Sequence, residues 1–290
     1  MNVAITGATG FIGSNLAKMF HRPVICDVVP RDFSNVLTPQ KLLTFLSTDY
    51  ADFHLDAVYH LGAISSTTET DTAALSDNNI MFSCQLLEQC ISKNIPFVYA
   101  SSASVYGLGE FGFEENTRLF PLNYYAVSKV AFDMFVERKI LDNPDAKIIG
   151  LRYFNVYGHN EDHKADMASP VHKFLEQSRS GKIKVFEGSE KFLRDFVHVS
   201  DAAEITKAAA DFLPGIYNVG TGTARSFLDV AEIISSLTGA EIEEIPFPTH
   251  LLGKYQDFTC SHNDKINNFY ERNRISIEDG IRKVYEDRIC

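Results

Sequence analysis

The 290-residue sequence has no apolar run of about 18 residues, the length that a membrane-spanning helix needs. Nor does it begin with the basic segment and apolar stretch of a secretory signal. Positive charge is scarce, with 27 lysines and arginines against 38 aspartates and glutamates and a net charge of −11. An acidic surface disfavours binding to nucleic acid or to an anionic membrane. We therefore expect a soluble, cytoplasmic protein that binds neither.

Cysteine is also sparse. The five cysteines are scattered along the chain, and none of them forms a Cys-x-x-Cys pair. An odd number without that spacing indicates neither a disulfide framework nor a zinc site, so we predict no metal. Hydrophobic residues nevertheless make up 45% of the chain, which suffices for a sizeable core in one large domain or two.

The first half of the chain alternates between two kinds of apolar pattern. Short apolar runs predict buried strands, and apolar residues at every third or fourth position predict helices. Strands at residues 2–6, 57–61, 97–100 and 147–151 alternate with helices at 79–93 and 124–141. This order predicts an α/β fold with a Rossmann-like, doubly wound parallel sheet, in which ligands bind beyond the carboxyl ends of the strands. After residue 155 the alternation stops, and residues 158–170 are expected to form a polar loop.

A glycine-rich turn follows the first predicted strand. Gly7, Gly10 and Gly13 give the spacing Gly-x-x-Gly-x-x-Gly, and helical apolar spacing follows them. Strand, glycine turn and helix are typical of a dinucleotide site, where the backbone approaches the pyrophosphate at the helix N-terminus. An ordinary turn with structural glycines is the alternative, but the regular spacing favours the dinucleotide site.

Two charged residues bear on which dinucleotide binds. Asp27 ends a further predicted strand at residues 23–27, about 20 residues after Gly7, the usual distance for a carboxylate that bonds the ribose hydroxyls of NAD. Arg31 lies shortly after it, where a guanidinium could pair with the 2′-phosphate of NADP. The residues themselves leave both cofactors open. Each side chain could instead be an ordinary turn or loop residue.

Tyr125 and Lys129 are four residues apart on a predicted helix, and Ser102 ends the strand before it. A phenol, with a pKa of about 10, is a poor base at neutral pH. An ammonium group one helical turn away should lower the pKa of Tyr125, and the Ser102 hydroxyl could hold a substrate oxygen. A chance pair on a solvated helix is the alternative, but the glycine turn favours an oxidoreductase site.

Together these motifs resemble those of the extended short-chain dehydrogenase/reductase superfamily of nucleotide-sugar epimerases and dehydratases. Within it, the chain is similar over nearly its whole length to the ADP-L-glycero-D-manno-heptose 6-epimerase family. Arg-Tyr-Phe-Asn-Val-Tyr-Gly at residues 152–158 recurs across the superfamily. More specific are Ser-Ser-Thr-Thr-Glu at 65–69, His-Lys at 163–164 and Phe-Glu-Gly-Ser at 186–189.

The resemblance implies roles for single residues. Tyr125 and Lys164 would be two acid/base residues, with Ser102 and Lys129 completing the catalytic set. Contacts with NADP, or with NAD in its place, are expected from Gly7, Gly10, Phe11, Ile12, Gly13, Asp27, Val28, Arg31, Leu61, Gly62, Ala63, Ile64, Ser65, Asn78, Lys129, Val156 and Lys164. Contacts with the nucleotide sugar are expected from Asn155, His172, Phe186, Glu187, Gly188, Ser189, Arg194 and Tyr255.

The implied reaction is epimerisation at C6″ of ADP-glycero-manno-heptose, from the D-glycero to the L-glycero form, for the heptose of the lipopolysaccharide core. Transient oxidation of the alcohol gives a planar ketone, and return of the same hydride to its other face inverts the carbon. A second acid/base residue is useful because the proton then returns from the other side, and Lys164 would supply it. The resemblance also implies a homo-oligomer.

Two domains are expected from the same resemblance. A dinucleotide-binding Rossmann domain would comprise residues 1–157 and about 192–213. A smaller C-terminal α/β lobe of residues 158–191 and 214–290 would bind the nucleotide sugar.

Two positions weaken the match to the family. His172 aligns with a substrate histidine only across a one-residue gap. The family often has Gly-Ser where this chain has Ala165-Asp166, and a carboxylate beside a diphosphate would be repulsive unless it turned away. Without the resemblance, Lys164 would be a solvated cation, Arg194 could form a structural ion pair, and Tyr255 could simply pack.

Three alternative functions differ from this one in the residues that they require. A 4,6-dehydratase needs an acid and a base directly after the catalytic serine, and Ala103 and Ser104 can serve as neither. A 4-epimerase of a UDP- or GDP-hexose shares the Ser-Tyr-Lys set but does not require Lys164. A non-catalytic nucleotide-binding regulator would have no need of the intact set. The last two alternatives stay open.

Overall fold

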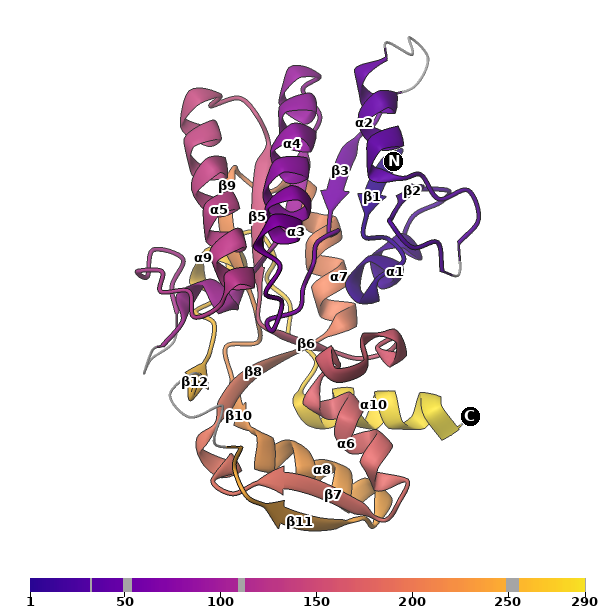
Figure 1. The fold of residues 1–290 in the computed structure, drawn as a ribbon, viewed down its shortest axis with the longest axis vertical. Helices are drawn as coiled ribbons and strands as arrows, with labels where there is room; N and C mark the ends of the chain where they lie inside the picture. Colours follow the sequence, from indigo (N-terminus) through magenta and orange to yellow (C-terminus); the bar gives the residue numbers. More distant parts are fainter. Residues whose placement is uncertain (32, 49–53, 109–112, 249–255, 290) are drawn as a thin grey trace. The chain divides into compact units, whose positions relative to one another are not determined.

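The computed structural model describes residues 1–31, 33–48, 54–108, 113–248 and 256–289, and it divides the chain into two compact units (Figure 1). Each unit has its own hydrophobic cluster. Unit 1 consists of Met1–Val105, Pro121–Arg152 and Ala203–Tyr217, and unit 2 consists of Tyr106–Phe120, Tyr153–Ala202 and Asn218–Cys290. The functional labels that the sequence suggested for its two domain ranges stay predictions.

A six-stranded sheet in the order β2-β1-β3-β4-β5-β9 forms the centre of unit 1. The β1–β2, β1–β3 and β3–β4 pairs are parallel. Both faces of β1 and β3 are buried, which explains why their sequences are continuous apolar runs. The predicted Rossmann-like fold is confirmed. The strands are β1 (Val3–Thr6), β2 (Val24–Cys26), β3 (Ala57–His60), β4 (Phe97–Ser102), β5 (Ile148–Tyr153) and β9 (Gly215–Val219).

Helices cover this sheet, and Figure 1 shows α4 and α5 side by side along it. Leu86 and Cys90 of α4 and Phe132 and Val136 of α5 are buried in the core, each pair four residues apart as a helix face requires. The predicted helices at 79–93 and 124–141 are therefore present. The helical elements are α1 (Phe11–Ala17), α2 (Pro39–Ser47), α3 (Thr72–Leu75), η1 (Ser76–Met81), α4 (Phe82–Ser92), η2 (Ala103–Tyr106), α5 (Tyr124–Asp142), α7 (Val199–Ala208) and η5 (Ala209–Asp211).

Two features of these helices differ from the sequence expectation. Sequence reasoning missed α2, although Thr38 caps it and Pro39 opens it, which is a recognisable helix start. The helix predicted at 79–93 begins in the π-helical turn η1, where the Phe82 N–H reaches back to the Asp77 carbonyl. A π-helical turn holds an extra residue and is frequent at functional sites.

Unit 2 is a smaller α/β structure. Strand β8 pairs in parallel with β6 and β12 and antiparallel with β10, while β7 and β11 form a separate parallel pair. Buried residues of α6, α8 and α10 share one cluster. The strands are β6 (Asn155–Tyr157), β7 (Lys182–Phe186), β8 (Leu193–His198), β10 (Ala224–Ser226), β11 (Glu241–Ile245) and β12 (Phe258–Thr259). The helices are η3 (Asp162–Met167), α6 (Pro170–Ser178), η4 (Ser189–Lys191), α8 (Phe227–Thr238), α9 (Asp264–Asn267) and α10 (Ile277–Ile289).

The polar loop predicted for residues 158–170 is wrong in part. The 3₁₀ helix η3 occupies Asp162–Met167, and α6 starts at Pro170. The Ser169 side chain accepts a hydrogen bond from the His172 N–H, so Ser169 and Pro170 form an ordinary helix start that polarity alone concealed.

None of the helices in the described part of the chain is both long enough and apolar enough to cross a membrane.

Candidate active site

The glycine turn after β1 is closely packed. Gly7 has a φ of +65°, and a Cβ added there would lie 2.5 Å from the Gly62 nitrogen. A Cβ on Gly13 would lie 2.0 Å from the Gly7 carbonyl oxygen. Gly10 is the N-cap of α1 and has no side chain to occupy the N–H groups of the first turn. This cradle fits the pyrophosphate of a dinucleotide, which would interact with those N–H groups.

Asp27 and Arg31 hold the loop beside this turn. The Asp27 carboxylate accepts hydrogen bonds from the N–H groups of Thr9 at 3.0 Å, Val28 at 2.7 Å and Val29 at 3.3 Å, and from Thr9 Oγ1 at 2.8 Å. Arg31 donates to the Thr9 carbonyl oxygen at 3.2 Å and is otherwise exposed. The Asp27 carboxylate therefore stabilises the loop through its hydrogen bonds, and Arg31 lies at the surface beside the glycine turn.

The segment from Leu61 to Ser65, expected to contact the cofactor, is fixed by a residue that sequence reasoning missed. Asn79 is buried and pairs with both backbone groups of Ile64, accepting from its N–H at 2.8 Å and donating to its carbonyl at 2.9 Å. It also donates to Ser128 Oγ on α5 at 3.0 Å. The neighbouring Asn78 is exposed and donates to the Ala74 carbonyl. The two asparagines are neighbours in η1, and the geometry of that turn directs Asn79 into the protein and Asn78 toward solvent.

Ser102, Tyr125 and Lys129 come together in unit 1. Ser102 ends β4, and α5 begins at Tyr124 because Asn123 caps it through the Ala126 N–H. Tyr125 and Lys129 are 9% and 6% exposed, and a hydrogen bond joins Tyr125 to Ser102. Lys129 Nζ donates to the Ala100 carbonyl at 2.9 Å and lies 5.9 Å from the centre of the Tyr125 ring.

The expectation that the pKa of Tyr125 lies below its usual value is wrong for this structure. Burial raises the pKa of Tyr125, and the hydrogen bond with Ser102 opposes that rise. Burial also lowers the pKa of Lys129 to about 8. Desolvation outweighs the nearby charge because both groups lie inside the protein, where charged forms are costly. At neutral pH the phenol is thus protonated, and Tyr125 needs further positive charge before it can act as a base.

Sequence reasoning did not predict a cluster of four interacting residues near Tyr125 and Lys129. Asp133 of α5 and Arg152 of β5 form a buried ion pair, with Nε and Oδ2 2.9 Å apart. Tyr99 and Ser101 of β4 donate to the same carboxylate, at 2.8 Å and 3.0 Å. Only Arg152 lay within a recognised motif, and its side chain points to the core rather than to a ligand site.

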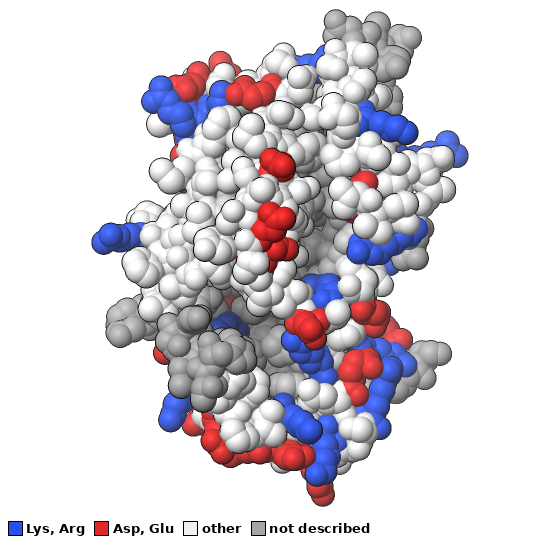
Figure 2. All heavy atoms as spheres, viewed as in Figure 1, with Lys and Arg blue, Asp and Glu red and all other residues white. Residues whose placement is uncertain are grey.

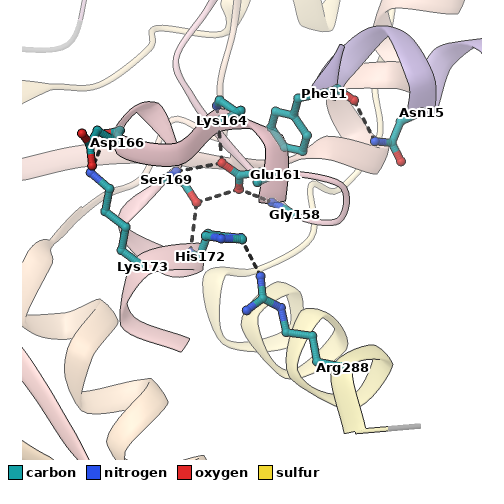
Figure 3. A network of polar contacts seen from close by, with 10 residues as sticks. All are labelled: Phe11, Asn15, Gly158, Glu161, Lys164, Asp166, Ser169, His172, Lys173 and Arg288. Atoms are coloured by element: carbon teal, nitrogen blue, oxygen red, sulfur yellow. Dashed lines mark hydrogen bonds and ion pairs between the residues drawn. The ribbon is translucent and has the colours of Figure 1, made fainter. Parts of the chain in front are cut away.

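Lys164 belongs to unit 2, where a buried carboxylate pairs with it (Figure 3). Lys164 Nζ lies 3.4 Å from Glu161 Oε2. Glu161 also accepts from the Gly158 N–H at 3.1 Å, and from Ser169 through its N–H and its hydroxyl, both at 2.7 Å. The acid is anchored by the start of α6, so it gives the lysine a fixed partner. Glu161 falls within the polar loop predicted for residues 158–170, and sequence reasoning assigned it no role.

Asp166, the departure from the family pattern, lies on the Lys173 side of η3 in Figure 3. Its side chain is exposed, and Lys173 Nζ donates to its backbone carbonyl at 2.7 Å. Ala165 before it has a φ of +46° and a ψ of −122°, a non-helical conformation that kinks η3 at this point. The kink lies between Lys164 and Asp166, although only one residue separates them in the sequence.

His172 is held by the C-terminal helix. Its Nδ1 lies 2.6 Å from Arg288 Nη2, and Arg288 also pairs with Glu176 at 2.6 Å. A guanidinium can only donate, so Nδ1 accepts, and the proton of the neutral ring lies on Nε2. Burial and the Arg288 charge lower the pKa of His172, which favours this neutral form. His172 therefore offers Nε2–H as a donor.

Most other predicted substrate residues lie in unit 2. Arg194 is buried on β8, donates to the Leu193 carbonyl at 2.9 Å and to the Gln256 carbonyl, and stacks over Phe227 at 5.4 Å. Its neighbour Asp195 accepts from Thr221, Gly222 and Ser261. Asn155 and Val156 are half-buried on β6; Phe186 ends β7, and Glu187, Gly188 and Ser189 lead into η4. Tyr255 lies outside the described residues.

The chain is similar to proteins of one family. Residues 3–220 match the NAD dependent epimerase/dehydratase family. A relative from Brachyspira hyodysenteriae, named ADP-L-glycero-D-manno-heptose-6-epimerase, is 38% identical over 307 residues that cover 98% of this chain and 96% of the relative. A relative of the same name from Alkalilimnicola ehrlichii is 42% identical over 283 residues, covering 89% and 88%.

Solved structures of similar fold cover nearly the whole chain. ADP-L-glycero-D-manno-heptose-6-epimerase from Helicobacter pylori is 28% identical with a TM-score of 0.81, covering 99% of this chain and 95% of that one. UDP-glucose 4-epimerase from Thermus thermophilus, in complex with NAD, is 25% identical with a TM-score of 0.83, covering 99% and 98%. The likeness therefore extends over both units.

Proposed function

Since the chain belongs to the NAD-dependent epimerase/dehydratase family, we propose that it interconverts ADP-D-glycero-D-manno-heptose and ADP-L-glycero-D-manno-heptose, as an isomerase. The observation that carries this proposal is the identity of 38% and 42% to relatives of that name over most of the chain. The product would serve synthesis of the lipopolysaccharide core. A cytoplasmic location stays a prediction.

The proposed mechanism uses the residues of both units. The turn of Gly7, Gly10 and Gly13 would hold the cofactor, which would supply reversible hydride exchange with C6″ and the positive charge of an oxidised nicotinamide. Tyr125 would then take the proton of the O6″ hydroxyl as a phenolate, while Ser102 donates a hydrogen bond to that oxygen. The Lys129 ammonium favours the phenolate by its charge.

In the second half of the proposed reaction, a residue of unit 2 would transfer a proton. Once C6″ is planar, a proton must reach the oxygen from the opposite side, and we assign this transfer to Lys164. Its partner Glu161 keeps the ammonium in a fixed position. Arg194 would pair with the diphosphate through its planar fork, and His172 would donate from Nε2.

The experiment that tests this function starts from either pure epimer. Incubation with the purified protein should convert each to the same mixture, because the reaction is reversible and involves no net redox change. NMR of the C6″ position distinguishes the two forms. If neither epimer changes while the cofactor is confirmed to be bound, the proposed activity is wrong.

We also propose that NADP is the preferred cofactor. The Asp27 carboxylate already accepts hydrogen bonds from three backbone N–H groups, so ribose hydroxyls would compete with the loop for it. Arg31 is exposed at the same edge and is held there by the Thr9 carbonyl. A guanidinium is well suited to the 2′-phosphate that distinguishes NADP from NAD.

The variant Arg31→Gln tests this preference. It should weaken NADP binding by about 10- to 100-fold, the loss expected for a charge-assisted hydrogen bond, and leave NAD binding nearly unchanged. Mass spectrometry of the nucleotide that co-purifies should show its composition shift from NADP toward NAD. Arg22→Gln, at another exposed arginine of unit 1, is the matched control. Equal NADP content in both variants would reject the role of Arg31.

A homo-oligomer is proposed as well, supported by one face of α5. Tyr124, Val127, Met134 and Leu141 are exposed at helical spacing along it. Figure 2 shows mainly uncharged residues with a few acidic ones over the middle of α4 and α5, and charges of both signs at the upper end of α5. Such an apolar stripe is typical of a protein contact surface. Light scattering that gives the mass of one chain at micromolar concentration would contradict this assembly.

A further inference from the structure

A buried ionic cluster in unit 1 joins α5, the helix that carries Tyr125 and Lys129, to strands β4 and β5. Asp133 and Arg152 are each 1% exposed and 2.9 Å apart. Tyr99 donates its hydroxyl to Asp133 Oδ1 and Ser101 donates to Oδ2. Burying a carboxylate is costly unless it is paired and hydrogen-bonded, and all three neighbours stabilise this one. Side chains from two strands, β4 and β5, thus meet the carboxylate of one acid on α5.

The cluster is linked through the chain to each member of the catalytic set. Asp133 follows Lys129 by four residues, so it lies one helical turn further along the same side of α5. Ser101 directly precedes Ser102 on β4. The carbonyl of Ala100, on the same strand, accepts the hydrogen bond of Lys129. The carboxylate therefore connects the end of β4 to the helix that carries the tyrosine and the lysine.

We propose that Asp133 is a positioning residue of this site, which fixes the β4 end against α5 and keeps Lys129 in its charged form. The proposal rests on the function proposed above, because it takes Ser102, Tyr125 and Lys129 as the reacting set. It goes beyond that function by assigning a task to a residue that touches neither substrate nor cofactor.

The charges around Lys129 support this role. Burial lowers the pKa of Lys129 to about 8, and Asp133 is the charge that opposes this drop. Tyr125 on α5 is protonated at neutral pH, because burial raises its pKa. His60 on β3 lies within electrostatic reach of Lys129 and is neutral, because burial lowers its pKa to about 3. Lysine is charged below its pKa and neutral above it. Loss of Asp133 should lower the pKa of Lys129 further, so that Lys129 loses its charge at a lower pH than in the wild type.

The test measures the charge of Lys129 directly in the intact enzyme. With isotope-labelled lysine, the Cε NMR signal of Lys129 is assigned by its loss in Lys129→Met and followed across pH. In Asp133→Asn we expect the titration midpoint to fall by roughly one pH unit. The alkaline limb of kcat for the epimerisation should move in the same direction. Tyr99→Phe and Ser101→Ala, which remove hydrogen bonds but keep the carboxylate, should leave the midpoint where it is.

A second variant covers the case in which Asp133→Asn fails to fold. That change leaves Arg152 buried without its partner charge, so Asp133→Asn with Arg152→Gln is made in parallel to remove both charges. The midpoint should fall here too, because the carboxylate that opposes the effect of burial on Lys129 is absent from both variants. An unchanged midpoint in either folded variant overturns the proposal. Lack of epimerisation by the wild type would reject the function instead, while the NMR midpoint would still decide the role of Asp133.

Discussion

Replacing Tyr125 with phenylalanine should lower kcat by about 10²- to 10⁴-fold while the cofactor remains bound. That range is the usual contribution of a positioned acid/base group, and phenylalanine removes only the hydroxyl that exchanges the proton. The ring is buried against the start of α5, and its shape is unchanged in the variant, so the fold should persist. The rate is followed by NMR of the C6″ position, and cofactor content by absorbance.

The adjacent residue supplies a matched control. Tyr124 is 54% exposed, and Tyr124→Phe makes the same chemical change one position earlier in the helix. It should keep wild-type activity. If Tyr125→Phe retained more than about a tenth of the wild-type rate, a loss too small for an acid/base group, another residue would have to exchange the proton.

Replacing Lys164 with methionine should also lower kcat by about 10²- to 10³-fold, since the proton could no longer be exchanged from the second side of C6″. Methionine keeps the length of the side chain and removes the ammonium that pairs with Glu161. Glu161 retains the N–H groups of Gly158 and Ser169 as donors, so the start of α6 should survive the change. Cofactor binding, measured by fluorescence titration, should be largely preserved.

The control for this variant is another lysine of unit 2. Lys182 forms a surface ion pair with Glu243 at 3.1 Å, and such exposed pairs contribute little. Lys182→Met should therefore have wild-type activity. Full activity in Lys164→Met would reject the two-base mechanism and favour a site like that of a 4-epimerase.

Contacts between residues close in the sequence could be predicted, because local geometry determines them. The strand, turn and helix around Gly7 and Gly10 follow from a few neighbouring residues. Tyr125 and Lys129 share one helical turn, so their proximity required only that the helix exist. Ser102 joined them because parallel strands end at one edge of the sheet. The structure brings these residues together, while their catalytic roles stay predictions.

The features that were missed depend on burial and on partners distant in the sequence. Arg152 and Asp133 are 19 residues apart and meet only because β5 packs beneath α5. The direction of the Tyr125 pKa shift was wrong for a related reason: spacing shows that an ammonium is near, but not how completely water is excluded. Glu161 appeared to be a solvated charge until α6 supplied donors for it.

The π-helical turn η1 is a place where the chain should tolerate the deletion of one residue. Such a turn holds one residue more than a regular helical turn, and the helices on either side keep their packing. Loss of a single codon here would close the turn into a regular helix, with the buried faces of α3 and α4 still in place. Asn79 would then lose its position beside Ile64. We therefore expect a one-codon deletion at this point to spare the fold and to remove the support that Asn79 gives to the Leu61–Ser65 segment.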